Sequence, residues 1–139
     1  MILLDTSGLF AALVRNQRAH EAAKAALDEA GPPFLLSPFV LAELDYFFAR
    51  EGGVGPELSF LAEVAAGAYD LVPFLGNDGA SAVGVIDDYR DLRIGLADAS
   101  IVVLAGRFRV DRVLTLDERH FRALRTPLGK PFTVLPADG

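Results

Sequence analysis

The chain has 139 residues, 52% of them hydrophobic, and a formal net charge of −6, which suits one domain with a single substantial core. It contains no cysteine and only two histidines, so disulfides, thiolate catalysis and zinc sites built from these residues are excluded. No apolar run approaches the roughly 18 residues of a membrane span and no signal peptide is visible, so we expect one cytoplasmic domain over residues 1–139.

Short apolar strands alternate with helices along the chain. Ser37-Pro38 is a helix start and Gly52-Gly53 a helix stop, while Asn77 is expected to cap a later helix. In chain order we expect a strand at 2–5, helices at 7–15 and 18–30, a strand at 34–36, helices at 38–50 and 57–67, a strand at 69–73, helices at 77–90 and 96–107, a strand at 112–116, a helical turn at 118–124 and a strand at 132–135. This alternation predicts an α/β fold whose mostly parallel sheet is covered on both faces.

Four acidic residues stand where such a fold would bring them together. Asp5 and Asp117 each follow a strand, and parallel sheets bind ligands at the carboxyl ends of their strands. Glu43 and Asp98 lie inside apolar helices, where an unpaired carboxylate is costly. Two carboxylates about 4 Å apart repel by roughly 4 kcal/mol at an effective dielectric near 20. The simplest explanation of such a group is a Mg²⁺ or Mn²⁺ site for phosphodiester chemistry.

Each acid also has a simpler interpretation. Asp5 and Asp117 could cap the helices that follow them, and Asp98 could favour the positive end of its own helix. Glu43 lies too deep in its helix for capping, so its alternative to a metal is a salt bridge, and it has a competitor in Asp45, which periodicity alone does not exclude. A metal site and a set of helix caps therefore both remain open for the single residues, and the case for metal rests on all four together.

Thr115 precedes Asp117 by two residues, so on an extended segment the two side chains project to one side. Its hydroxyl could orient a metal-bound water beside the acids. The histidines His20 and His120 lie among helical charges, and we interpret both as surface or packing residues.

Charge is distributed unevenly along the chain. Residues 1–89 carry −9, whereas residues 90–139 carry +3. The basic residues of the second part could form a local surface for phosphate despite the acidic total, or could simply cover solvated helix ends. The candidates for this surface are Arg107, Arg109, Arg112, Arg119, Arg122, Arg125 and Lys130.

Four motifs in order resemble those of PIN-domain ribonucleases, and more narrowly of VapC-type toxins of bacterial toxin–antitoxin pairs. The resemblance spans nearly the whole chain and implies a twisted, mostly parallel sheet of about five strands between helices. It also favours Glu43 over Asp45. The motifs are Leu4-Asp5-Thr6-Ser7, Ser37-Pro38-Phe39-Val40-Leu41-Ala42-Glu43-Leu44, Arg93-Ile94-Gly95-Leu96-Ala97-Asp98-Ala99-Ser100 and Leu114-Thr115-Leu116-Asp117-Glu118-Arg119-His120-Phe121.

The resemblance further implies an endoribonuclease that depends on Mg²⁺ or Mn²⁺, forms a homodimer and is inhibited by a cognate antitoxin. Asp5, Glu43 and Asp98 would hold a first metal ion, and Asp117 would complete that site or a second one. Hydrolysis would leave 5′-phosphate and 3′-hydroxyl ends. We expect single-stranded or loop RNA, with tRNA and rRNA as candidates, because exposed bases can be read. The RNA-binding candidates are Arg112, Arg119 and Arg122.

Two hypotheses from other functional classes compete with the nuclease hypothesis. A phosphoacceptor signalling domain also gathers acids at this edge of a sheet, but it needs a nearby lysine and the chain has only Lys24 and Lys130. A non-catalytic partner-binding module would leave Glu43 and Asp98 without a reason. Cleavage of RNA with and without Mg²⁺ separates the nuclease from both.

Overall fold

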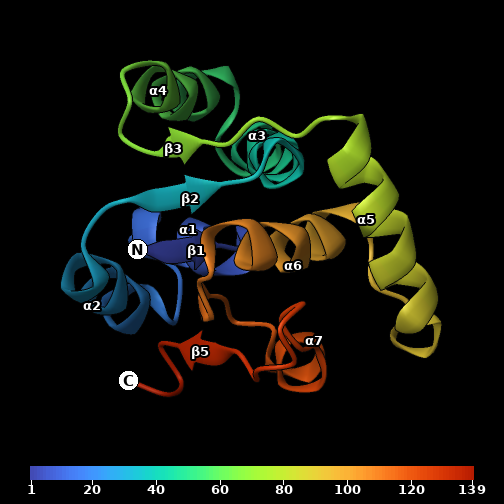
Figure 1. The fold of residues 1–139 in the computed structure, drawn as a ribbon. Helices are drawn as coiled ribbons and strands as arrows, with labels where there is room; N and C mark the ends of the chain where they lie inside the picture. Colours follow the sequence, from blue (N-terminus) through green and yellow to red (C-terminus); the bar gives the residue numbers. More distant parts are fainter.

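The computed structural model describes all 139 residues, and its centre is a five-stranded sheet in the order β3-β2-β1-β4-β5. Every neighbouring pair of strands is parallel, as the alternation of strands and helices predicts. In Figure 1 the arrows of β2 and β3 point the same way. The strands are β1 (Ile2–Leu4), β2 (Phe34–Leu36), β3 (Asp70–Leu71), β4 (Arg112–Leu114) and β5 (Thr133–Leu135).

Seven α-helices surround the sheet. In Figure 1, α6 crosses in front of β1 while α1 lies behind it, so the central strand is covered on both faces. No helix is long and apolar enough to cross a membrane. The helices are α1 (Thr6–Leu13), α2 (His20–Ala30), α3 (Pro38–Gly52), α4 (Val54–Ala65), α5 (Gly76–Asp88), α6 (Leu96–Phe108) and α7 (Glu118–Ala123), with a 3-10 turn at Arg90–Leu92.

The core is centred on β1 and α6. All three residues of β1 are fully buried, and Leu3 pairs with Leu35 on one side and Val113 on the other. Helix α6 adds a nearly continuous buried segment, Ala99–Ala105. Such runs without alternation are typical of a parallel sheet and a helix that are enclosed on all sides.

Gly8 lets α1 start directly against the end of β4. A Cβ atom at this position would lie 2.3 Å from the carbonyl oxygen of Leu114, a separation that no side chain tolerates. Because α1 can approach so closely, the residues around Asp5 and Ser7 come to lie beside Thr115. This contact therefore helps to build the carboxyl edge of the sheet.

Helix starts follow the sequence expectations in one case and not in another. Ser37 caps α3, since its Oγ accepts a hydrogen bond of 3.2 Å from the backbone N–H of Phe39. The expected cap at Asn77 is wrong, because α5 already begins at Gly76. There the Asp78 carboxylate reaches back to the N–H of Leu75 at 3.0 Å and satisfies that donor instead.

Candidate active site: an acidic cleft at the carboxyl edge

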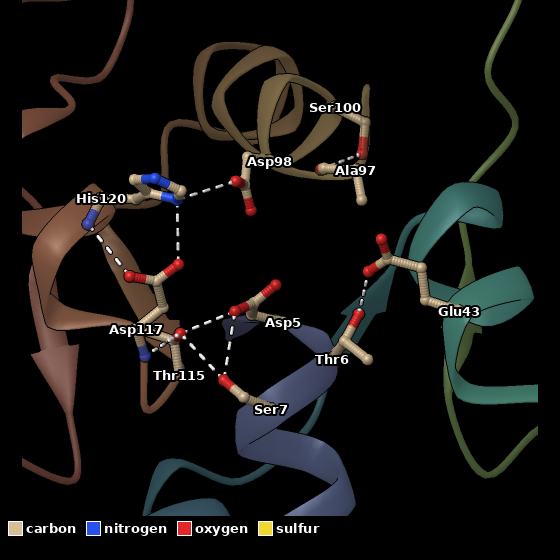
Figure 2. A network of polar contacts seen from close by, with 10 residues as sticks. All are labelled: Asp5, Thr6, Ser7, Glu43, Ala97, Asp98, Ser100, Thr115, Asp117 and His120. Atoms are coloured by element: carbon tan, nitrogen blue, oxygen red, sulfur yellow. Dashed lines mark hydrogen bonds and ion pairs between the residues drawn. The ribbon is translucent and has the colours of Figure 1, made fainter. Parts of the chain in front are cut away.

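The four acids identified in the sequence meet at the carboxyl edge of the sheet. Asp5 follows β1, Asp117 follows β4 by a short turn, Glu43 lies on α3 and Asp98 lies in the first turn of α6. All four line one cleft of about 540 Å³. Figure 2 shows their carboxylates converging from these separate elements.

Asp5 is a buried carboxylate held by hydroxyl groups. Its Oδ2 accepts hydrogen bonds from Thr115 Oγ1 at 2.6 Å and from Ser7 Oγ at 3.4 Å. Asp5 occupies the N-cap position of α1 but makes no side-chain capping bond, so helix capping does not explain it. Burial raises its pKa to about 7; the Thr115 hydrogen bond opposes the rise, and the charges of Asp98 and Glu43 add to it.

Thr115 links Asp5 to Asp117. While its hydroxyl donates to Asp5, the same oxygen accepts the backbone N–H of Asp117 at 2.9 Å and lies 3.3 Å from Ser7 Oγ. Thr115 is buried and does not line the cleft. Its hydroxyl therefore faces its protein partners and not the open cleft where a water would be oriented.

Glu43 lies across the cleft from Asp117 and His120 (Figure 2). Its Oε1 accepts a 2.6 Å hydrogen bond from Thr6 Oγ1 (Figure 2). The expectation that this carboxylate would be desolvated is wrong: Glu43 is exposed, because this face of α3 forms the wall of the open cleft. Asp45 instead lies beside Glu57 of α4 and raises the pKa of that carboxyl through a shared hydrogen bond.

His120 lies between Asp98 and Asp117. Its Nδ1 is 3.2 Å from Asp98 Oδ2 and 2.9 Å from Asp117 Oδ2 (Figure 2), although it makes a properly angled hydrogen bond with neither. Asp117 also caps α7, since its Oδ1 accepts the backbone N–H of His120 at 3.0 Å. The interpretation of His120 as a surface or packing residue is wrong; the three-residue spacing after Asp117 on a helical turn was the available signal.

Asp98 is the second acid of the cleft with a clearly raised pKa. Burial is the main cause, the neighbouring His120 opposes the rise, and the charges of Asp117 and Glu43 add to it. Its helix is fixed to α3 by a buried pair of serines, in which Ser37 Oγ and Ser100 Oγ are 2.6 Å apart. Ser100 is one of the few polar residues of α6, and that was the only hint of this link in the sequence.

The donors of the cleft fit a hard divalent cation. One ligand atom each from Asp98, Asp117 and His120 lies within 4.8 Å of the others, and Asp5 and Glu43 complete an oxygen-rich set of the kind that Mg²⁺ and Mn²⁺ prefer. Burial is the main reason that the pKa values of Asp5 and Asp98 are raised, and the charges of neighbouring acids add to the rise, so a bound cation would favour the ionised forms. The ligand atoms that lie this close together come from Asp98, Asp117 and His120, whereas Asp5, Glu43 and Asp98 are the residues expected from the sequence to hold the first metal ion.

None of the three RNA-binding candidates lines the cleft. Arg122 forms ion pairs with Asp138 at 2.7 Å and Glu118 at 3.0 Å. Arg112 begins β4 and so lies at the amino edge of the sheet, away from the acids. Arg119 precedes His120 on α7, is exposed and makes no hydrogen bond or ion pair.

Comparison with known proteins places this cleft in a family. The model of the PIN domain matches residues 2–126. Ribonuclease VapC26 of Mycobacterium tuberculosis is 42% identical over 135 residues, covering 97% of this chain and 100% of that protein.

Solved structures of similar fold include toxins and toxin complexes. The crystal structure of Mycobacterium tuberculosis VapC20, a Sarcin-Ricin loop cleaving toxin, has a TM-score of 0.77 at 17% identity and covers 84% of this chain and 90% of that one. A toxin–antitoxin complex from Klebsiella pneumoniae has a TM-score of 0.66 at 23% identity, covering 89% and 92%. VapBC2 of Rickettsia felis, bound to a DNA fragment from their promoter, has a TM-score of 0.68 at 18% identity, covering 96% and 98%. At these identities the three structures support the fold alone.

Proposed function

The chain belongs to the PIN-domain family and is a ribonuclease toxin of the VapC type, and we propose that the four carboxylates of its cleft carry out the cleavage of RNA. The observation that carries this proposal is the convergence of Asp5, Glu43, Asp98 and Asp117 from four separate elements into one cleft. Two of these acids have pKa values raised chiefly by burial. A bound cation would stabilise the ionised form of such a site.

Two sets of residues would form the metal site: acids that bind the ion and hydroxyl groups that position the acids. Asp5, Glu43, Asp98 and Asp117 would hold Mg²⁺ or Mn²⁺, which when bound supplies positive charge for the phosphate and acidity for the attacking water. Thr115 and Thr6 keep two of the carboxylates in place through 2.6 Å hydrogen bonds. These fixed acids thereby reduce the reorganisation that the reaction requires.

The finer features of the reaction belong to the same proposal and rest on the resemblance to PIN-domain ribonucleases. Hydrolysis of the phosphodiester bond would leave a 5′-phosphate and a 3′-hydroxyl. The cleft is a local hollow on a chain of net charge −6, which suits a single-stranded segment or a loop better than a long duplex. The structures of toxin–antitoxin complexes with this fold support an antitoxin partner. We also expect a homodimer.

The two other classes of function gain no support from the cleft. A phosphoacceptor domain needs a lysine beside its acidic residues, but neither Lys24 nor Lys130 lines the cleft. Lys24 is paired with Asp28 on α2 at 2.7 Å. A non-catalytic binding module would give no reason for four converging acids.

The direct test is cleavage of total cellular RNA by the purified protein, followed by 5′-end sequencing of the products. We expect cleavage with Mg²⁺ or Mn²⁺, none with EDTA, and none with the Asp98→Asn variant in either condition. Ends that bear a 5′-phosphate would support hydrolysis in the proposed direction. Cleavage that persists in EDTA would overturn the metal-dependent reaction, and an inactive wild-type protein would overturn the assignment of the cleft.

A further inference from the structure

The wall of the cleft beside Glu43 also carries an aromatic ring and a positive charge. Phe47 and Arg50 follow Glu43 on α3 at spacings of four and seven residues, which places all three on one face of the helix. Both line the cleft together with Gln17 from the loop between α1 and α2. The proposed hydrolysis of a phosphodiester bond assigns no role to these three side chains.

Phe47 supports the guanidinium group of Arg50. The Arg50 Cζ atom lies 4.8 Å from the centre of the Phe47 ring, within the range of a cation–π contact. The Phe47 ring is itself steadied by Phe10, whose ring centre is 6.0 Å away. Phe48 is different, because it stacks on Phe60 inside the protein at 4.8 Å.

Arg50 is held on this ring but is open to the solvent. About half of its side chain is exposed, and its only ion pair is with Glu51 of the same helix at 3.0 Å. An exposed pair of this kind is weak. The ring of Tyr46, whose centre is 5.4 Å from the Arg50 Cζ atom, is itself exposed, so neither neighbour prevents the guanidinium plane from taking another partner. Guanidinium planes are surfaces on which unpaired RNA bases stack.

We propose that Arg50, backed by Phe47, is the stacking platform for an unpaired base next to the phosphate that is cleaved, and that the amide of Gln17 contacts the edge of this base. The inference rests on the proposed function, since it assumes RNA in the cleft. Gln17 is half-buried, and its amide offers both a donor and an acceptor. The cleft volume of about 540 Å³ lies within the roughly 300–1,000 Å³ of small-ligand sites, which leaves room for a nucleotide beside the acids.

The test separates stacking from charge. A short single-stranded RNA in which 2-aminopurine replaces alternate bases is titrated with the Asp98→Asn protein in EDTA, so that binding is seen without cleavage. We expect quenching of the fluorescence on binding. Adding Arg50→Lys keeps the positive charge but removes the plane, and should abolish most of the quenching and weaken affinity on the order of tenfold. The slope of affinity against salt should stay the same.

The matched control is Arg90→Lys in the same background. Arg90 is also an exposed arginine paired with a carboxylate of a nearby residue, Asp87, but it does not line the cleft. This variant should quench and bind like its parent. Phe47→Leu should lose part of the quenching and affinity, as Arg50→Lys does. Phe47→Tyr should quench and bind like the parent, because the tyrosine ring still supports the guanidinium group.

Other results would overturn the platform. Arg50→Lys with unchanged quenching and affinity would place the base elsewhere, and a parent protein that binds the RNA without any quenching would mean that no base stacks. Both are distinct from failure of the proposed function, which is measured by Mg²⁺-dependent cleavage with the wild-type protein. The base contact of Gln17 fails separately if Gln17→Ala leaves the base preference at the mapped cleavage sites unchanged.

Discussion

On one side of the cleft, Asp5 and Glu43 accept 2.6 Å hydrogen bonds from the hydroxyl groups of Thr115 and Thr6. On the other side, Asp98 and Asp117 both approach Nδ1 of His120. We refer to these as the hydroxyl side and the imidazole side. Hydroxyl donors orient a carboxylate without neutralising it, whereas a protonated imidazole would supply the positive charge that a metal ion also supplies. The hydroxyl side is thus fixed independently of any cation, and the imidazole side is where a bound ion changes the charge balance most.

The largest effect is expected from a change on the imidazole side. Asp98→Asn keeps the shape of the side chain but removes the charge that holds the ion, so cleavage should fall on the order of a thousandfold, the upper end for loss of one fixed electrostatic group. The metal-free variant should melt at an unchanged or higher temperature, because repulsion among the acids is relieved. Full cleavage by the purified variant would remove Asp98 from the site.

A pH titration of metal-free protein tests the buried acid of the hydroxyl side. Because the pKa of Asp5 is raised to about 7 in the folded protein, its contribution to stability is fully present below the unfolded pKa near 4 and is lost as pH rises toward 7. For a pKa shift of this size, the free energy of unfolding that Asp5 loses over this pH range is at most roughly 4 kcal/mol. Asp98 acts in the same direction. Urea unfolding in EDTA should show the free energy of unfolding falling as pH rises. Both Asp5→Asn and added Mg²⁺ should reduce this fall. A free energy of unfolding that does not change with pH would contradict the raised pKa.

The two acids of α3 offer an internal comparison. Glu43→Gln should retain the hydrogen bond from Thr6 and yet lose cleavage on the order of a hundredfold, because the charge facing the cleft is gone. Asp45→Asn should cleave normally, since Asp45 lies against Glu57 and outside the cleft. Steady-state cleavage rates at saturating Mg²⁺ decide the matter. The reverse pattern would mean that α3 is rotated relative to the structure.

Replacing Gly8 or Gly84 by alanine distinguishes the effect of close packing on stability from the effect of helix propensity. Gly8→Ala places a methyl group against the backbone of Leu114, and should cost about 1–3 kcal/mol of stability and disturb the hydroxyl side. Gly84→Ala on α5 meets nothing within 4 Å, and should stabilise the protein by about 0.5–1 kcal/mol. Urea unfolding measures both. Equal effects of the two changes would show that the contact between α1 and β4 is less tight than described.

The smallest effect concerns the arginines at the rim of the imidazole side. Arg119→Ala should reduce the slope of RNA affinity against salt by about 0.7, the value for one phosphate contact with a single strand. Arg122→Ala should change the slope less, because Arg122 is already paired with Asp138 and Glu118. If Arg119 instead serves an acidic segment of the antitoxin, inhibitor affinity falls while cleavage of free RNA stays normal. Affinities for RNA and for antitoxin, measured on the same variants, distinguish these roles.

The amino-acid sequence determines the elements and the chemistry of this protein to a large extent. Apolar runs separated by caps and glycines give the strands and helices, because burial and local hydrogen bonding act over a few residues. The position of an acid after a strand, as at Asp5 and Asp117, places it at the carboxyl edge once the sheet is parallel. The position of Asp98 in an apolar helix likewise marks it as a residue with a special role.

Only the tertiary structure decides which groups share a contact. Thr115 reaches Asp5 and Thr6 reaches Glu43 across long separations in sequence, and no local pattern carries such information. The same is true of the exposure of Glu43, which depends on where α3 stands beside the cleft. His120 acquires its position between Asp98 and Asp117 only because α6 and α7 begin at the same edge of the sheet. Periodicity reports the face of an element, whereas the neighbours of that face are set by packing.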